Sequence, residues 1–295
     1  MAKWYSAELT VHLKTDLHCG TSPLGFISRT LPFVPSHIPF YALVLSIARK
    51  INLPEERITD LESFLSSHIR FTPFFIYYNN HFLFPWEKES MIELEKRFLY
   101  SYYGVALDYN TRGAMENRLF EKEVILAVPI NRKEEAYLGN KKTTQLKGYI
   151  FWKEGKDSDL KLNLTSDCML NNIPIEEFIM KSQWGGEINK GLGCLKDVQK
   201  IDTKNIFSGE LLNNNTTSPV IRWPANEKSP FYLQYNEEIN IEGHLIPLTG
   251  RRYDLERGPG VKMDDVIFVW DIGWEIKKDI KIEIDIRCVK LVTPL

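Results

Sequence analysis

The feature that most constrains this chain is a cluster of glycines with the sequence WGGEINKGLG at residues 184–193. Four glycines fall between Gly185 and Gly193, after a predicted helix that begins near Pro174 and before a predicted strand at 194–201. Glycine lets a backbone turn tightly and approach other groups closely. Such a loop can hold a phosphate or clasp a nucleic-acid backbone through free N–H groups, with Lys190 as a nearby positive charge. A tight helix-to-strand connection without a ligand is an equally good interpretation.

The remainder of the first two thirds of the chain alternates between strands and helices. Leu9, Val11 and Leu13 alternate with polar residues, which is the period of a strand with one buried face. Further predicted elements are helices at 35–48, 54–67 and 91–100, strands at 69–78, 81–84 and 119–128, an irregular segment at 108–117, and a hairpin of 147–153 with 160–164. This order predicts an α+β, ferredoxin-like fold with an antiparallel sheet and packed helices.

A break in the pattern suggests a domain boundary. The polar run NNNTTS at 213–218 is the best candidate for a flexible connection. Beyond it the chain is predicted to be strand-rich, and Ile280, Ile282 and Ile284 alternate with charged residues. We therefore divide the sequence into a first domain at 1–205 and a C-terminal region at 206–295.

Bulk properties exclude several classes of protein. The formal net charge of -2 provides no global positive field, so nucleic-acid binding has to depend on local patches. No apolar run is long enough to span a bilayer, and no signal peptide is recognisable. The four cysteines are scattered without a CxxC pair, which predicts a cytoplasmic protein with neither a zinc site nor a disulfide framework. We expect no cofactor.

Three segments resemble motifs of the RAMP superfamily, the CRISPR-associated "repeat-associated mysterious proteins". The glycine cluster GGEINKGLG resembles their late glycine-rich signature. LHCGT at 17–21, followed by RTLPFVPS at 29–36, is similar to their early "LHIGSG" and "PYIPGSSLKGALR" segments. VALDYNTRGA at 105–114, ending in LFEKEV at 119–124, is similar to their "IDRxTGxAxxxxLFxxEV" segment. The resemblance covers residues 9–201, in the order that the family shows.

This resemblance implies RRM-like domains and a place in a type III CRISPR effector complex. It makes 1–205 an RNA-binding domain with an inserted arm around 104–160, and leaves a second RRM-like domain as one option for 206–295. The implied partners are CRISPR RNA, other RAMP subunits and a large polymerase-like effector subunit. The RNA-binding candidates are His18, Gly20, Arg29, Arg112, Arg118, Gly185, Gly186, Lys190, Gly191, Gly193, Arg251 and Arg252.

Within the superfamily, catalytic and structural roles compete. The aspartate that cuts target RNA sits in a "GxID" context, and Ser28 occupies the corresponding place here, where a hydroxyl cannot replace a metal-binding carboxylate. Asp108 is a second candidate for cutting, and His18 and His37 are candidates for guide processing because imidazole can transfer protons near neutral pH. We expect a non-catalytic subunit that caps or stacks on the guide, with an endoribonuclease as the alternative.

Other interpretations stay open at this point. The paired arginines Arg251 and Arg252 suit backbone contacts or a solvated hairpin end equally well. Trp184 can stack on a base or anchor the end of a helix. Outside the RNA-binding class, a small-molecule enzyme lacks a nucleophile–base pair in the sequence, and a protein-interaction module is the other rival.

Overall fold

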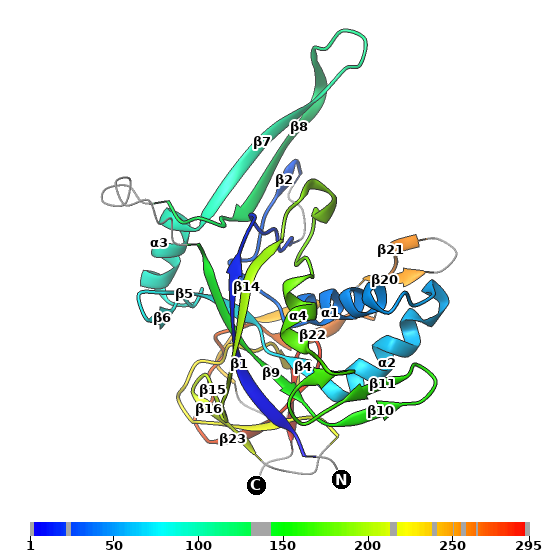
Figure 1. The fold of residues 1–295 in the computed structure, drawn as a ribbon. Helices are drawn as coiled ribbons and strands as arrows, with labels where there is room; N and C mark the ends of the chain where they lie inside the picture. The colour runs from blue at the N-terminus through cyan, green and yellow to red at the C-terminus, as the bar shows by residue number, and fades with distance from the viewer. Residues whose placement is uncertain are drawn as a thin grey trace.

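The computed structural model describes residues 3–21, 25–130, 143–212, 217–237, 241–249, 251–254, 258–263 and 265–292, without the side chains of 114, 116–118, 251–254 and 258–263. In it, a body of sheets and helices carries a long two-stranded arm that projects from one end (Figure 1). No helix among these residues is long and apolar enough to cross a membrane.

The body is built on one antiparallel sheet with β1 (Tyr5–Leu13) near its centre. β1 pairs with β14 (Leu195–Asp202) on one side and with β9 (Gln145–Trp152) on the other. The sheet continues through β5 (Phe74–Tyr78) to β3 (Phe33–Val34). With α1 (His37–Lys50) after β1 and α4 (Ile175–Met180) before β14, the core order is β-α-β-β-α-β. The predicted α+β, ferredoxin-like fold is therefore confirmed.

Helices cover one face of this sheet. Leu9 and Val11 on β1 and Ile150 on β9 are fully buried in a core that they share with α1 and α4. Leu43 and Ile47 lie on the buried side of α1, at the spacing of one helical turn. Next to α1, the short helix η1 (Glu55–Arg57) leads into α2 (Ile58–His68).

A second sheet covers the opposite face. Its strand order is β15 (Asn205–Ile206), β16 (Gly209–Leu212), β17 (Val220–Trp223), β23 (Ile280–Ile284), β24 (Val289–Val292), β18 (Leu233–Gln234), β22 (Ile267–Trp270) and β19 (Leu245–Leu248). Trp223 and Ile282 pack with Trp4 and Phe151 of the first domain. The described residues of 206–295 form strands and no helix, so the strand-rich composition is as predicted, while the helices of an RRM-like unit are not among them.

The arm consists of β7 (Leu99–Leu107) and β8 (Ala114–Ile125), and β2 (Ile27–Ser28) pairs in parallel with the base of β8. It follows α3 (Lys88–Arg97). The predicted helix end at residue 100 and the predicted arm limits of 104–160 are wrong, because the arm spans 99–125. Both faces of β7 are largely exposed. Its sequence therefore lacks the alternation of apolar and polar residues by which a half-buried strand is recognised.

The predicted hairpin of 147–153 with 160–164 is also wrong. β9 pairs with β1, β5 and β4 (Ile69–Phe71), and its residues are almost all buried, as expected for a central strand. The remaining short strands are β6 (His81–Phe82), β10 (Gly155–Asp157), β11 (Leu162–Leu164), β12 (Met169–Leu170), β13 (Ile173–Pro174), β20 (Arg251–Asp254) and β21 (Gly258–Met263).

Candidate nucleic-acid interface

The glycine loop is a close-packed clasp around the chain at residues 16–18. Gly185, Gly191 and Gly193 all adopt the left-handed conformation, with φ of 78°, 82° and 74°. A Cβ atom at Gly185 would lie 2.4 Å from the carbonyl oxygen of His18, and one at Gly193 would lie 1.9 Å from that of Trp184. No side chain fits at these two positions, so their glycines serve close backbone contact.

Several N–H groups of the loop are already hydrogen-bonded within the protein. Gly186 donates to the carbonyl of His18 at 2.8 Å, and Gly193 donates to that of Asp16 at 2.8 Å. Gly191 donates to the carbonyl of Ile188 at 3.0 Å, within the short helix η2 (Ile188–Lys190). The expectation that these N–H groups are free to cradle a phosphate is therefore wrong, because they close the loop on itself and on the chain after β1.

Trp184 and His18 anchor the two sides of the clasp. The Trp184 ring is fully buried, and its Nε1 donates to Ser182 Oγ at 3.1 Å, so it anchors the loop and is not available to stack on a base. His18 is 5% exposed. Its Nδ1 lies 2.7 Å from the carbonyl oxygen of Glu123, and its Nε2 lies 3.2 Å from Ser28 Oγ. Because a carbonyl can only accept, Nδ1 carries the proton and Nε2 accepts from the serine.

Hydrogen bonds tie the arm to this clasp. Glu123 of β8 accepts a bond from the backbone N–H of Thr30 at 3.0 Å through its carboxylate. Thr30 Oγ1 in turn accepts from the N–H of Cys19 at 2.8 Å. Gly20 leaves room for the imidazole, since a Cβ atom there would lie 2.9 Å from His18 Nε2. The early segment, the end of the arm motif and the glycine loop thus meet in one hydrogen-bonded cluster.

The charges at the loop are partly neutralised. Glu187 contacts Lys122 Nζ through Oε1 and Lys190 Nζ through Oε2, the second at 2.8 Å. Hydrogen bonds from Lys122 and then Lys190 lower the pKa of Glu187 to about 2. The cluster keeps one net positive charge, and the exposed Lys190 ammonium also lies 5.7 Å from the centre of the Phe120 ring. Sequence reasoning did not single out Glu187, although a carboxylate inside a glycine-rich loop that contains a lysine could have indicated an ion pair.

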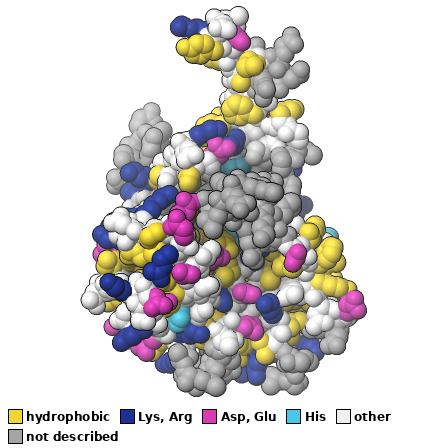
Figure 2. Space-filling view, turned by 90° about the vertical axis from the view of Figure 1, so that its right-hand side faces the viewer, with side chains coloured by type: hydrophobic (Ala, Val, Ile, Leu, Met, Phe, Trp, Pro, Cys, Tyr) yellow, Lys and Arg dark blue, Asp and Glu magenta, His cyan; other side chains and the backbone are white. Residues whose placement is uncertain are grey.

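The projecting part of the arm is rich in exposed apolar and aromatic side chains. Tyr103 is 71% exposed, Leu107 is 62% exposed and Tyr109 is 95% exposed. Figure 2 shows apolar side chains on the arm, which stands clear of the body. Sequence reasoning missed this group, because it assigned no element to 101–107 and predicted an irregular polar segment at 108–117.

Asp108 and Arg112 lie at the tip of the arm. The exposed Asp108 carboxylate accepts hydrogen bonds from the N–H groups of Asn110 (3.0 Å) and Thr111 (2.7 Å) and from Thr111 Oγ1 (3.0 Å). These bonds lower the pKa of Asp108, those from Thr111 having the larger effect. Asp108 thus shapes the turn, while Arg112, with φ of 52°, donates its N–H to the Asp108 carbonyl at 2.9 Å.

The other candidates are dispersed. His37 begins α1, away from the clasp, and burial together with the nearby charge of Arg287 lowers its pKa to about 4. Arg29 is exposed beside β2, close to the clasp. The backbones of Arg118, Arg251 and Arg252 lie in strands β8 and β20, and their side chains are outside the described part.

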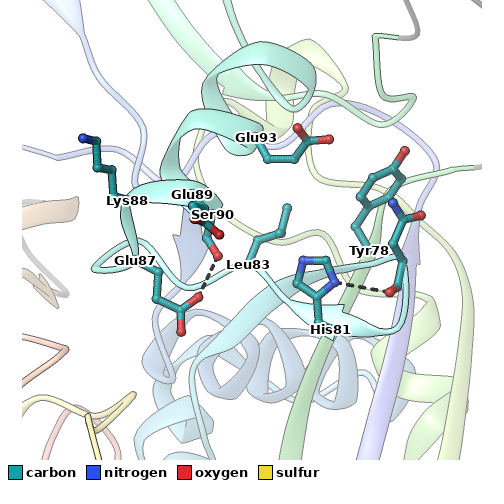
Figure 3. A pocket seen from close by; sticks show the side chains of 9 residues that line it. Tyr78, His81, Leu83, Glu87, Lys88, Glu89, Ser90 and Glu93 are labelled. Atoms are coloured by element: carbon teal, nitrogen blue, oxygen red, sulfur yellow. Dashed lines mark hydrogen bonds between the residues drawn. The ribbon is translucent and has the colours of Figure 1, made fainter.

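A hollow with a volume of about 690 Å³ lies between hairpin β5–β6 and α3 (Figure 3). Glu87, Glu89 and Glu93 contribute carboxylates to its lining, and Ser90 Oγ donates to Glu87 at 2.7 Å. Carboxylates repel the phosphates of RNA. This hollow is therefore a poor site for a nucleic acid, and the clasp at the arm base is the better candidate.

Comparisons with known proteins give a partial likeness. No protein-family profile and no curated protein matches the chain. One chain of a type III-B Cmr-beta complex in the apo state is 10% identical, with a TM-score of 0.41 over 67% of this chain and 97% of that chain. Chains of the same complex type bound to cognate target RNA, one also with AMPPnP, are 11% and 12% identical, with TM-scores of 0.46 and 0.43. Each of these two matches covers 92% of this chain and 86% of the matched chain. TM-scores below 0.5 do not by themselves establish a common family.

Proposed function

We propose that this chain is a guide-RNA-binding, non-catalytic subunit of a type III CRISPR effector complex. The observation that carries the proposal is the clasp. Three segments that resemble RAMP motifs are separated by up to about 170 residues in sequence, yet hydrogen bonds join them at the base of the arm. Segments that only share a chance likeness have no reason to meet.

The geometry supports contact with an RNA backbone at the arm base. In an RRM-like fold, RNA commonly binds on the sheet face opposite the helices. Here the C-terminal sheet covers that face, since Tyr149 and Phe151 are buried against it. The arm and its base stay accessible, and Arg29 and Lys190 are exposed there. A subunit that accepts any guide sequence has to grip phosphates and 2′-hydroxyls, which these charges suit.

The arm adds aromatic surface to this basic region. Tyr103 and Tyr109 are largely exposed, and exposed aromatic rings stack on nucleic-acid bases without reading their sequence. Binding without base-specific hydrogen bonds is what a guide-holding subunit needs.

The side chains suggested for catalysis are otherwise engaged. Both ring nitrogens of His18 are hydrogen-bonded within the protein, and the ring is buried. The Oδ1 atom of Asp108 accepts three hydrogen bonds from its own turn. Ser28 occupies the position where the family's aspartate would sit, and it holds His18 in place. These contacts favour a structural role, capping or stacking on the guide beside other RAMP subunits and a large polymerase-like subunit.

The test is to purify the chain with its native complex and to measure bound nucleic acid. The proposal predicts RNA of uniform length and ultraviolet cross-links from the chain to that RNA. Cross-linking should fall several-fold in the variants Arg29→Ala and Lys190→Ala, because each removes a charge beside the clasp. Lys277→Ala is the matched control, since this lysine is 82% exposed and lies in the C-terminal sheet region. A complex without RNA would refute the proposal.

A further inference from the structure

Strand β22, next to the edge strand β19 of the C-terminal sheet, is apolar on both faces. Ile267 and Val269 point toward an aromatic cluster that includes Phe33 and Phe75 of the first domain. Phe268 on β22 and Val266 just before it lie on the opposite face, and Trp270 on that face is partly buried against the core of the C-terminal sheet. Phe268 is 54% exposed and Val266 is 52% exposed. A strand that buries one face normally presents polar side chains on the other.

Neighbouring strands extend this apolar face. On β19, Leu245 is paired with Trp270, and Pro247 is paired with Phe268. Beyond β18, Tyr235 donates its N–H to the carbonyl of Phe268 at 2.9 Å, and its ring lies 6.0 Å from that of Trp270. We call this group the β19–β22 patch, and it consists of the exposed Tyr235, Leu245, Pro247, Val266 and Phe268 with the partly buried Trp270.

A strand in the middle of the same sheet shows the usual alternation of apolar and polar faces. On β23, the buried Ile280, Ile282 and Ile284 alternate with Lys281 and Glu283. An apolar exposed face is therefore not a general property of this sheet. Contiguous exposed apolar surface with a polar border marks interaction sites on soluble proteins.

The charges around the patch identify the kind of partner. Residues 229–250 and 264–276, which contain the patch, include no Lys or Arg, and their charged residues are all Asp or Glu. Exposed Glu237 follows Tyr235, and exposed Asp265 precedes Val266. Basic residues follow these ranges in sequence: Arg251 and Arg252 belong to hairpin β20–β21, and Lys277 pairs with Glu242 at 3.3 Å. An RNA backbone would meet these carboxylates, and a second copy docked symmetrically on the same patch would place acids against acids.

We propose that the β19–β22 patch is the docking surface for a different protein, whose contact surface has apolar side chains bordered by lysine or arginine. Its aromatic residues and its lack of lysine match the composition of interface centres. Complementary charges at the border then set the orientation and speed of association. This inference is independent of RNA binding, because it concerns the sheet away from the arm.

The partner is expected to cover the face of the sheet and not to add a strand to its edge. β19 is the last strand of the sheet, and Pro247 within it has no N–H to donate. Side-chain packing on Phe268 and Leu245 is therefore the larger contribution to binding.

Site-specific photo-cross-linking in the cells that naturally produce the protein tests this proposal. Benzoyl-phenylalanine replaces Phe268 in the full chain, and Leu245 is a second insertion site in case the first variant is unstable. Arg222 is the matched control, because it is exposed in the same sheet on β17. We expect a cross-link to one other protein from positions 268 and 245 and none from 222. The cross-linked peptide should contain apolar residues with Lys or Arg close by.

A charge reversal then tests the chemistry of the border. Asp265→Lys combined with Glu237→Lys should lower the cross-linking yield at least several-fold, because like charges would then face each other. An unchanged yield overturns the proposal. So do cross-links that are nuclease-sensitive, cross-links to a second copy of the chain, and equal cross-linking from 268 and 222.

Discussion

The two left-handed glycines at the end of the clasp provide a sharp test of its structural role. Gly191 and Gly193 have nearly the same φ, 82° and 74°, so alanine meets a similar conformational penalty at both. They differ in their surroundings. A Cβ atom at Gly191 has nothing within 4 Å, whereas one at Gly193 would lie 1.9 Å from the carbonyl oxygen of Trp184. Comparing the alanine variants at these two positions therefore separates the cost of the left-handed conformation from the cost of the steric clash.

The expected magnitudes follow from these contacts. Gly191→Ala should lower the free energy of unfolding by about 1 kcal/mol, the cost of a left-handed residue with a side chain. Gly193→Ala adds displacement of the backbone, which breaks the bonds from Trp184 to Gly193 (2.9 Å) and from Gly193 to Asp16 (2.8 Å). Each such bond contributes about 1 kcal/mol, so the total loss should be about 3 kcal/mol or more.

Equilibrium unfolding in urea, followed by tryptophan fluorescence, measures both variants. The fluorescence is informative because Trp184 is fully buried in the clasp. We expect a clearly lower midpoint for Gly193→Ala than for Gly191→Ala, with an unchanged dependence on urea concentration. If the two variants lose stability equally, within about 0.5 kcal/mol, the clasp does not depend on close packing at Gly193 and the reasoning is refuted.

Three further predictions concern charge. Glu187→Gln releases Lys122 and Lys190 from their ion pairs, so the RNA affinity measured by fluorescence anisotropy should rise at low salt. The logarithm of this affinity should fall more steeply with the logarithm of the salt concentration, by about 0.7 per released lysine. An unchanged slope would contradict the ion-pair account. The folded-state pKa of His37, about 4, lies below its usual 6.5, so the fold favours the neutral ring. Its contribution to the free energy of unfolding is complete above pH 6.5 and is lost as the pH falls toward 4. Urea unfolding should show about 2 kcal/mol less stability from this group at pH 5 than at pH 7, and His37→Gln should remove that part of the pH dependence; an identical pH profile for the variant would count against it. Finally, Asp108→Ala should leave any Mg²⁺-dependent cutting of target RNA by the complex unchanged, because Oδ1 of Asp108 is hydrogen-bonded within the turn of the arm. Loss of cutting in this variant would make Asp108 catalytic.

The core of the fold was predictable because its elements carry strong periodicity. Leu9, Val11 and Leu13 are buried as their alternation indicates. The partners of β9 were not predictable, because a strand that is buried on both faces carries no period to set its register. β7 was missed for the opposite reason, since neither of its faces is buried.

The candidate site was predictable in its location but not in its chemistry. The sequence pointed to His18 and to the glycine loop, and these do meet. It could not show that the N–H groups of Gly186 and Gly193 are already bonded, because hydrogen-bond partners depend on segments that are distant in sequence. For the same reason it could not pair Glu187 with Lys122, which lies on the arm.

The central position of β1 has a consequence for biosynthesis. β1 leaves the ribosome before its two neighbours, which are β9, beginning at Gln145, and β14, beginning at Leu195. At a synthesis rate of 5–20 residues per second, β1 waits roughly 10 to 40 s for its last neighbour. During that time a strand with an apolar face and two unpaired edges is exposed to other chains. The order of synthesis thus leaves β1 without its last neighbour until β14 has been made, and the clasp can close only after Gly193 has left the ribosome.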